Sequence, residues 1–452
     1  MEFEVVPVVD DGLGNTAWLV ALGDGRALAV DASRDLRAVR SAAGRRGLSI
    51  AFVADTHLHA DFVTGAVDLA AGGARVLASA AGGRLFPHVG LRDGDEVDLG
   101  GLTLRALGTP GHTDEHLSFL LLDGSRPLGV FTGSSLIVGA AARTDLVDPD
   151  RTEELARAQW RSLQRLVTLP DEVLVWPTHG PGSFCSAPPG AARSSSIGGE
   201  KVGNALVNAG SEDAFVSAAL LAGLGAYSAY FRHLGEVNRR GPRPVPSVPA
   251  LAALTADQVA AAVEVGAVLV DVRPVEAFAA GHIPGAVSIP LRGAFATWLG
   301  WTTHPGTPLV FVRDAEQDAE EIVWQALKIG FEQLAGELDS GMPAWRSAGL
   351  PVSSTSLLSA AILNGRTVID VRQRSEYVAG HIPEASNVEL GQLAEGAMPQ
   401  VAAGAVVMCG HGERAMTAAS LLERGGQPGV AVVVGGPEDW ASAAGRAPAV
   451  SS

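Results

Sequence analysis

The chain has 452 residues, of which 47% are hydrophobic and 18% charged, as is typical of several globular domains and not of a disordered chain. Its formal net charge of −16 argues against nucleic acid and against an anionic membrane as partners, because both bind clusters of Lys and Arg. Its two cysteines, Cys185 and Cys409, are too few for a disulfide scaffold and indicate a reducing compartment. We therefore expect a cytoplasmic protein and leave open whether it forms a homo-oligomer.

Residues 1–190 alternate short apolar segments with turns rich in Gly and Asp. Helices are expected over Leu36–Arg46 and Thr152–Leu166, where apolar residues recur at helical spacing. The expected strands are Phe3–Val9, Thr16–Leu22, Ala27–Val30, Ile50–Ala54, Arg75–Ala78, Leu102–Leu107, Leu117–Leu122, Leu128–Phe131 and Val173–Trp176. Strands and helices in this order predict a layered α/β domain.

Histidines follow several of these predicted strands. His57 and His59 lie on the loop after the strand Ile50–Ala54, and His112 and His179 lie on later loops beside Gly and Pro. Imidazoles on loops at one edge of a sheet can converge on a metal ion. The predicted metal ligands are therefore His57, His59 and His112, with Asp61 and His179 as further candidates.

These motifs, together with Phe131-Thr-Gly133 and Arg143-Thr-Asp145, resemble the metallo-β-lactamase fold, in its persulfide dioxygenase and glyoxalase II branches. The resemblance covers residues 1–190 and implies an αββα sandwich with a site for Fe(II) or Zn. Two residues depart from the family pattern: Phe62 stands where the pattern has a histidine, and Ser134 stands where it has an aspartate ligand. A neutral hydroxyl is a poor replacement for a carboxylate on a divalent ion.

Two interpretations of this region stay open. In the first, three histidines form a metal site with help from Asp61 or Asp145. In the second, the domain holds no metal and its histidines are relics.

Residues 191–249 are expected to form a helical connector and a linker. Glu212–Val237 has a helical composition, and the Pro-rich Arg239–Pro249 marks the clearest domain boundary. Ala214–Phe231 carries no charge, but it is rich in Ala, Gly and Ser, so we expect a buried or interface helix and no membrane span.

An internal repeat follows the linker. The motif Asp271-Val-Arg and the later Gly281-His-Ile-Pro recur as Asp370-Val-Arg and Gly380-His-Ile-Pro at one constant offset. Each copy is expected to begin with a helix, followed by a β-branched strand, and this order predicts two parallel-sheet α/β domains. The shared motifs are expected to be structural, as an internal ion pair and a turn, and neither His282 nor His381 is expected to be catalytic. The predicted domains are 250–352 and 353–452, with first helices at Thr255–Val263 and Ser356–Leu363.

The second copy carries the strongest candidate for a nucleophile. Cys409 ends a predicted buried strand, and Gly410 and Gly412 allow the following loop to curl so that its N–H groups point inward. The next helix adds its positive N-terminal end and Arg414 adds a full charge, so the loop favours a thiolate and a bound persulfide anion. The open alternative is an ordinary buried thiol at a strand end.

The first copy lacks these features. Its corresponding strand runs into Arg313–Asp318, a segment with three acids and no cysteine. We therefore predict that this copy is catalytically inactive.

The repeat and the cysteine loop resemble the rhodanese (sulfurtransferase) family over about residues 250–450. The resemblance implies that Cys409 and Arg414 are catalytic and that the sulfur-binding loop is Gly410, His411, Gly412 and Glu413. Related loops that are one residue longer belong to phosphatases, and Glu413 would repel a phosphate dianion, so sulfur transfer is favoured. Cys185 is either a sulfur relay or a structural thiol. The segment 230–242 resembles the connector of fused proteins that join both kinds of domain, which extends the resemblance to nearly the whole chain.

The favoured hypothesis is thiol persulfide metabolism. A low-molecular-weight persulfide would be oxidised to sulfite at the N-terminal metal, and Cys409 would pass sulfane sulfur to a thiol or sulfite acceptor. One alternative is a sulfurtransferase or sulfur carrier with a metal-free, non-catalytic N-terminal scaffold. A second alternative is a glyoxalase-II-like thioester hydrolase, which needs a metal-activated water.

Overall fold

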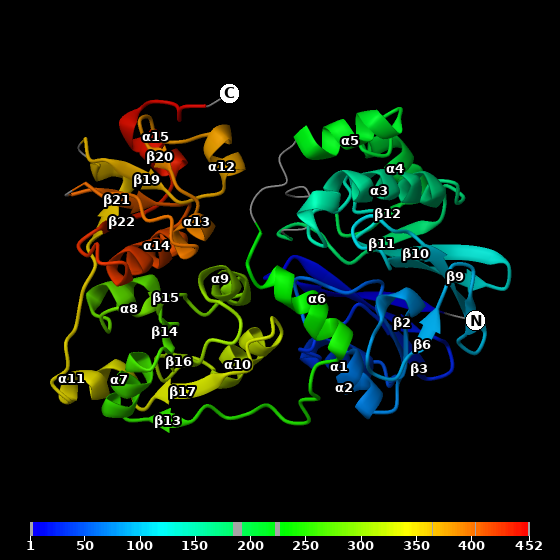
Figure 1. Ribbon diagram of the computed structural model, residues 1–452, viewed down its shortest axis with the longest axis horizontal. Helices are drawn as coiled ribbons and strands as arrows, with labels where there is room; N and C mark the ends of the chain where they lie inside the picture. Colours follow the sequence, from blue (N-terminus) through cyan, green and yellow to red (C-terminus); the bar gives the residue numbers. More distant parts are fainter. Residues whose placement is uncertain (1–2, 184–191, 222–226, 364, 403, 451–452) are drawn as a thin grey trace. The chain divides into compact units, whose positions relative to one another are not determined.

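Figure 1 shows the computed structural model of the protein, which describes residues 3–183, 192–221, 227–363, 365–402 and 404–450. The chain divides into two compact units. The first unit comprises residues 1–225, 229–248 and 327–330, and the second comprises residues 226–228, 249–326 and 331–452.

The described part of the first unit contains two six-stranded β-sheets. The first sheet follows chain order: β1 (Glu4–Asp10), β2 (Asn15–Ala21), β3 (Arg26–Val30), β4 (Ser49–Ala54), β5 (Arg75–Ser79) and β6 (Val89–Leu91). The second sheet also follows chain order: β7 (Glu96–Asp98), β8 (Leu102–Gly108), β9 (Leu117–Asp123), β10 (Arg126–Gly133), β11 (Leu174–Pro177) and β12 (Ser195–Ser196). The helices are α1 (Arg37–Gly44), α2 (Ala66–Ala71), α3 (Thr152–Leu166), α4 (Ile197–Gly203), α5 (Glu212–Leu221) and α6 (Phe231–Arg240).

Three apolar clusters arrange these elements in four layers. The central cluster joins the facing sides of both sheets, for example through Phe52 of β4 and Phe119 of β9. A second cluster packs α1 and α2 against the first sheet, and a third packs α3 and α5 against the second sheet, with Leu163 and Phe215 buried. The layers are therefore helix, sheet, sheet and helix, which confirms the predicted αββα sandwich.

Parallel pairing brings the functional loops of this unit to one edge. Strands β3, β4 and β5 are parallel, and β10 pairs in parallel with β11. The carboxyl ends of parallel strands meet at the same edge of a sheet, so the loops after β10 and β11 lie close together at one edge of the second sheet. Backbone bonds tie them further, because Thr178 N donates to Gly133 O at 2.9 Å and Thr16 N donates to Thr178 O at 2.7 Å.

Helix α3 supports this edge from the side of the second sheet. Acidic Glu153 and Glu154 stand in its first turn and Arg165 in its last, an arrangement that complements the helix dipole. Its buried stripe includes Leu155 and, unusually for a core position, the polar Gln159. Gln159 therefore faces the loops that carry Ser135 and His112 and not solvent.

The second unit contains two five-stranded sheets among its described residues. The first has the order β13 (Ala253–Leu254), β17 (Leu334–Leu338), β16 (Leu309–Val312), β14 (Val268–Asp271) and β15 (Val287–Ser288). The second has the order β18 (Leu357–Ser359), β22 (Ala431–Val434), β21 (Val406–Met408), β19 (Val368–Asp370) and β20 (Ser386–Asn387). The helices are α7 (Ala256–Glu264), α8 (Val275–Ala280), α9 (Phe295–Thr302), α10 (Ala319–Leu327), α11 (Gly341–Ser347), α12 (Arg374–Ala379), α13 (Leu390–Ala394), α14 (Glu413–Arg424) and α15 (Pro437–Ala444).

All strand pairs in both of these sheets are parallel, as the internal repeat predicts. The strand orders are equivalent, so the two copies share one topology. Helix α7 begins one residue after the expected Thr255, which is its N-cap and forms a reciprocal capping box with Gln258.

Two expected helices differ from the structure. The helix expected over Ser356–Leu363 is wrong: Leu357–Ser359 forms β18 and only a short 3₁₀ turn follows, because Gly365 with a φ of 71° ends the segment before a helix can form. The helix expected over Ala214–Phe231 is also interrupted, since residues 227–230 are not helical. The helical connector expected over Glu212–Val237 contains α5 and α6. In the described part of the chain, no helix is both long enough and apolar enough to cross a membrane.

Candidate active sites

The loop after β4 is organised around one buried carboxylate. Asp31, at the end of β3, adopts a left-handed φ of 51° that non-glycine residues rarely adopt. Its Oδ1 accepts the Thr56 N–H at 2.7 Å and lies 3.0 Å from His59 Nε2. Its Oδ2 accepts the Thr56 hydroxyl at 2.7 Å and also the hydroxyl of Thr178. Asp31 therefore joins the β4 loop to the β11 loop.

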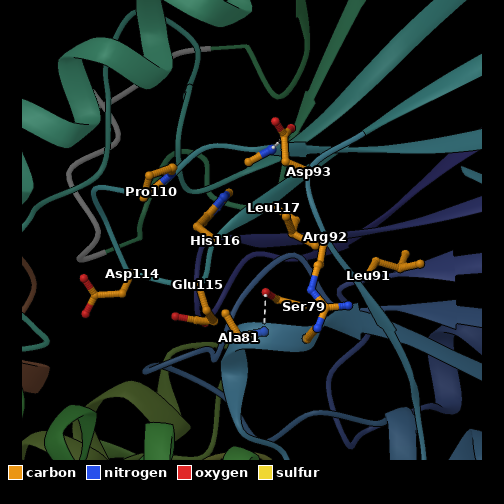
Figure 2. Close-up of a pocket in the computed structure, with 12 residues that line it drawn as sticks. Ser79, Ala81, Leu91, Arg92, Asp93, Pro110, Asp114, Glu115, His116 and Leu117 are labelled. Atoms are coloured by element: carbon orange, nitrogen blue, oxygen red, sulfur yellow. Dashed lines mark hydrogen bonds between the residues drawn. The ribbon is translucent and has the colours of Figure 1, made fainter. Parts of the chain in front are cut away.

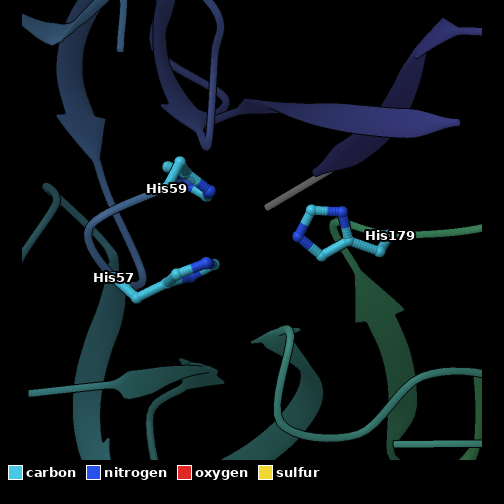
Figure 3. A group of neighbouring side chains, drawn as sticks. All are labelled: His57, His59 and His179. Carbon is cyan, nitrogen blue, oxygen red and sulfur yellow. The ribbon is translucent and has the colours of Figure 1, made fainter. Parts of the chain in front are cut away.

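Three histidines converge beside this carboxylate. Figure 3 shows His57, His59 and His179 facing a common space, and their ligand nitrogens all lie within 4.8 Å of one another. All three side chains are buried. Within the described residues, His59 Nδ1 and His179 Nε2 have no hydrogen-bond partner, so each leaves a buried nitrogen unsatisfied. A buried, unsatisfied imidazole nitrogen facing other imidazoles fits a metal ligand.

Hydrogen bonds fix which nitrogen each histidine presents. His59 directs Nε2 to Asp31, His179 directs Nδ1 to Asn15 Oδ1 at 2.7 Å, and His57 directs Nδ1 to the Thr56 hydroxyl at 2.9 Å. The other ring nitrogen of each is then left as a base. This is the orientation by outer partners that metal-binding imidazoles require.

His112 lies beside this group but outside it. Its ring centroid is 5.0 Å from that of His57, and its Nδ1 lies 2.7 Å from the carbonyl of Arg143. Its backbone N–H donates to Gln159 Oε1 at 2.9 Å, which explains the buried glutamine of α3. The geometry thus groups His179 with His57 and His59 and places His112 next to them.

Of the two acidic candidates, Asp61 lies beside the histidines, with Oδ2 3.6 Å from His179 Nδ1. Asp61 Oδ2 accepts a hydrogen bond from Asn15 Nδ2 at 2.7 Å, and Asn15 in turn contacts His179. Asp145 pairs with Arg143 at 2.7 Å. Asp61 is therefore placed to orient a histidine, and Asp145 is held by an arginine.

The two departures from the expected ligand set are visible in the site. Ser134 Oγ lies 3.2 Å from His57 Nε2. The Ser134 hydroxyl therefore contacts the ring nitrogen through which His57 would bind a metal, at the position where the family pattern has an aspartate. The ring of Phe62 stacks on His59, with centroids 4.1 Å apart. The donor set of three imidazoles fits one Zn or Fe(II) ion, whereas these residues do not supply the carboxylate and fourth histidine of a two-metal centre.

Burial controls the protonation of the cluster. Desolvation lowers the pKa of His57 well below its usual value, lowers the pKa of His112 to about 4 and lowers the pKa of His179. These rings are therefore neutral at pH 7, the form that binds metals. For His59, burial lowers the pKa, but the charge and hydrogen bond of Asp31 outweigh it and raise the pKa overall. A metal ion would compete with that proton.

His116 is a further buried histidine that the sequence reasoning missed. Its ring stacks on His57 with centroids 4.9 Å apart, its Nδ1 lies 2.9 Å from the Thr109 hydroxyl, and its Nε2 accepts the Ser134 N–H at 3.1 Å. Both ring nitrogens are thus engaged, so His116 supports Ser134 and is not a free ligand. Its position four residues after His112, on the same loop, was the available signal.

A cavity of about 430 Å³ opens beside His116 (Figure 2). Charged residues line it, among them Arg92, Asp93 and Glu115. Glu115 Oε1 also accepts the N–H of Leu58, between the two histidines of the β4 loop, at 2.7 Å. The cavity wall is therefore connected directly to the metal-site loop.

The Cys409 loop lies in the second unit, between β21 and α14. Cys409 is buried, with 2% of its surface exposed, and its Sγ accepts the backbone N–H of Gly412 at 3.1 Å. Gly412 caps α14 with a φ of 100°, a conformation that strongly favours glycine. The loop thus closes back on the sulfur, with a donor aimed at it.

Arg414 has a fixed partner beside this loop. Its two terminal nitrogens form a fork with Glu376 at 2.6 and 2.8 Å, and its guanidinium lies 5.7 Å from the ring centroid of Trp298. Burial opposes the charge of Arg414, but the hydrogen bonds and charge of Glu376 outweigh it, so the pKa of Arg414 is raised. The charge of Arg414 is therefore partly neutralised by Glu376, whereas the sequence alone predicts that the whole charge acts on the Cys409 loop.

The first copy places an arginine where the second has its cysteine. Asp271 pairs with Val312 across β14 and β16, as Asp370 pairs with Met408 across β19 and β21, so Arg313 occupies the position of Cys409. Arg313 is bonded to Glu337 and donates to the carbonyl of Gln317 at 3.0 Å. This loop presents no thiol.

The motifs shared by the copies form the internal ion pairs that the sequence predicts. Arg273 pairs with Asp271 at 2.6 Å, and Arg372 pairs with Asp370 at 2.7 Å. Each arginine also donates to the carbonyl of the glycine that precedes the repeated histidine, Gly281 or Gly380. The histidines bond through Nδ1 to carbonyls four residues earlier. Cys185, the predicted relay, lies outside the described residues.

Comparison with known proteins agrees with this division of the chain. A family model for the rhodanese-like domain matches residues 255–348 and 354–443. The chain therefore contains two rhodanese-like domains, the domain type of sulfurtransferases.

The remaining part resembles metallo-β-lactamase-fold proteins. The chain is 40% identical over 129 residues to a hydroxyacylglutathione hydrolase of Acidiphilium cryptum, and 31% identical over 137 residues to the mitochondrial persulfide dioxygenase ETHE1 of Homo sapiens. These matches cover 27% and 29% of this chain, and in each case the chain spans half the length of the relative. The crystal structure of a metallo-β-lactamase from Staphylococcus aureus matches 75% of this chain and 98% of its own, with 27% identity and a TM-score of 0.65. The fold is that of a metallo-β-lactamase-type sandwich followed by two rhodanese-like domains.

Proposed function

We propose that this protein is a sulfurtransferase that carries sulfane sulfur on Cys409 and acts in thiol persulfide metabolism. The observation that carries the proposal is the N–H of Gly412, which points at Cys409 Sγ from 3.1 Å. A donor aimed at the sulfur stabilises a thiolate, and it also stabilises the persulfide anion that replaces it. The N-terminal end of α14 lies at the same place and adds a partial positive charge.

The sulfur chemistry needs no oxidant or reductant. The Cys409 thiolate attacks the outer sulfur of a persulfide or of thiosulfate, the S–S bond of the donor breaks, and a thiolate or sulfite leaves with the electron pair. An acceptor thiolate, sulfite or cyanide then attacks the terminal sulfur of Cys409–S–S⁻. The second S–S bond breaks, and the Cys409 thiolate is regenerated.

The test compares the wild-type chain with Cys409→Ser and Cys185→Ser. We expect the wild type and Cys185→Ser to form thiocyanate from thiosulfate and cyanide and to gain the mass of one sulfur atom on Cys409. Cys409→Ser should do neither. Sulfur loading that persists in Cys409→Ser would contradict the proposal.

A second activity, oxidation of a persulfide to sulfite, is favoured by the convergence of three buried histidines. His57, His59 and His179 would hold one Fe(II) or Zn ion, with His112 adjacent. When bound, iron would supply the redox and Lewis-acid chemistry by which a persulfide, dioxygen and water give sulfite and the free thiol. The chain's own part is to orient the ligands: Asp31 holds His59, and Asn15 holds His179.

Metal content and oxygen uptake test this second activity. Protein grown with added iron or zinc is expected to bind about one metal equivalent, and His59→Ala should lose it. Glutathione persulfide should cause oxygen uptake by the iron-loaded wild type and none by His59→Ala, while thiosulfate–cyanide activity stays equal in both. Absence of metal and of uptake, with sulfur transfer intact, would indicate a sulfurtransferase with a non-catalytic scaffold.

The thioester hydrolase alternative receives less support from the geometry. Ser134 and Phe62 occupy positions that a two-metal hydrolytic centre would need for an aspartate and a histidine. If the metal-loaded wild type hydrolyses a glutathione thioester and His59→Ala does not, the hydrolase alternative would be supported.

A further inference from the structure

The first copy of the rhodanese-like domain, which has Arg313 at the position of Cys409, contacts the cysteine loop of the second. Within the second unit, Arg292 Nη2 lies 2.7 Å from Glu413 Oε2, an oxygen of the loop itself. Trp298 of the same copy lies against Arg414. The first copy thus contacts both charged residues at the end of the Cys409 loop, Glu413 through Arg292 and Arg414 through Trp298.

Hydrogen bonds between hydroxyl side chains of the second copy and the backbone of the first hold the two copies in this register. Thr417 Oγ1 donates to Ser288 O at 2.6 Å, and Ser288 N donates to Ser420 Oγ at 3.1 Å. These bonds join the end of β15 to the first turns of α14, the helix that Glu413 begins. Arg292 follows β15 closely, so its reach to Glu413 is set by this pairing.

Glu413 is an unfavourable residue for a loop that must carry a sulfur anion. A carboxylate near a thiolate or persulfide repels both, because like charges destabilise each other. The N–H of Gly412 and the end of α14 favour the anion, whereas Glu413 opposes it. An opposite charge placed on Glu413 removes that opposition.

We infer that Arg292 is a positioning residue for sulfur transfer at Cys409, because it pairs with Glu413 and cancels the one negative charge within the loop. The inference rests on the proposed function. On this inference, the first copy helps the Cys409 loop of the second copy to hold a sulfur anion.

The same pair stands in the wall of a cavity of about 280 Å³. Leu291, Gln317 and Arg292 line it from the first copy, and His411 and Glu413 line it from the second. The side chains of Arg292 and Glu413 are 40% and 32% exposed, so solutes reach the pair and salt screens it. The effect of losing Arg292 is therefore expected on rate and on salt dependence, more than on folding.

The test is a charge cycle measured by thiocyanate formation. We expect Arg292→Ala to lower kcat/KM for thiosulfate by roughly two- to fivefold at low salt, with a smaller loss at high salt. Arg292→Lys should keep most of the rate. Adding Glu413→Gln to Arg292→Ala should restore the rate, because the repelling charge is gone. Arg366→Ala is the matched control, since Arg366 is exposed and lies before β19, at the opposite edge of the sheet from Cys409.

A second readout separates charge from packing. The rate of Cys409 alkylation by iodoacetamide is measured against pH, and its midpoint should move to higher pH in Arg292→Ala and return in the double variant. An unchanged midpoint, or a double variant as slow as Arg292→Ala, would overturn the inference. If the wild type forms no thiocyanate, the proposed function fails, and the alkylation profile alone still decides the role of Arg292.

Discussion

Phe62 stacks on His59 with ring centroids 4.1 Å apart and planes inclined by 25°. Phe62 stands where the metallo-β-lactamase pattern has a histidine, so an apolar ring takes the place of a possible ligand beside His59. Together with the Ser134 hydroxyl beside His57, it leaves the site without the aspartate and the histidine that a two-metal centre would use.

Restoring the absent ligands should therefore raise the metal content. We expect Ser134→Asp combined with Phe62→His to bind about one more metal equivalent than the wild type, because a carboxylate can bridge two ions and a fourth imidazole can hold the second. Elemental analysis after exhaustive dialysis measures this. Equal metal content in both proteins would show that other residues limit the site.

The Asp31 carboxylate should control metal affinity without binding the metal. Burial raises its pKa, but His59 and its other hydrogen-bond donors lower the pKa to about 2, so it is charged throughout the physiological range. Asp31→Asn keeps a side chain that tolerates left-handed φ, yet it no longer holds His59 as a charged acceptor. We expect roughly 10–100-fold weaker metal binding in a chelator competition. Asp145→Asn, which alters a carboxylate paired with Arg143, is the control and should bind as the wild type does.

The buried ion pairs of the repeat should support stability and not catalysis. Arg273→Ala leaves the buried Asp271 without its partner, and such a loss costs about 3–5 kcal/mol. Urea unfolding followed by tryptophan fluorescence should show a weakened transition of the second unit. Full activity per folded molecule is expected, and a catalytic loss without destabilisation would refute the structural role.

The contact between His282 and Glu423 should give a pH-dependent term in stability. The hydrogen bond from His282, with Nε2 2.9 Å from the carboxylate, lowers the pKa of Glu423 below its usual value of 4.5. The folded pKa is thus depressed, so the stabilisation is present above about pH 4.5 and is lost as the pH falls through the folded pKa. Glu423→Gln should lower Tm near pH 6 and leave it close to that of the wild type at the acidic end of the range. A constant difference in Tm at all pH values would contradict this.

Much of the fold was accessible from the sequence. Each predicted strand of the first unit overlaps an observed one, because strand periodicity is strong where one sheet faces a core. The repeat motif located the Asp271 and Asp370 ion pairs, since residues two apart after a parallel strand are close in any such domain. The helix over Ser356–Leu363 was predicted wrongly because the spacing of apolar residues in this segment contains no information about the pairing of β18 with β22.

The candidate sites were accessible only in part. His57 and His59 are marked by their spacing, but the grouping of His179 with them depends on how loops from distant strands meet, which no local pattern contains. His116 differs from its neighbours only by its contacts with Thr109 and Ser134. The Arg292–Glu413 pair joins residues far apart in the sequence, and it follows from how two domains pack.

The Arg313 loop has a consequence for engineering the protein. The Arg313 guanidinium donates to several backbone carbonyls, including that of Gln317. In this loop carbonyl oxygens therefore point at the side chain, whereas at Cys409 a backbone N–H does. Arg313→Cys alone would place a thiol among carbonyl oxygens and would leave Glu337 without its partner. A two-carrier version of this chain would therefore require grafting the whole turn, with its glycines, so that the polarity of the peptide groups is reversed along with the side chain.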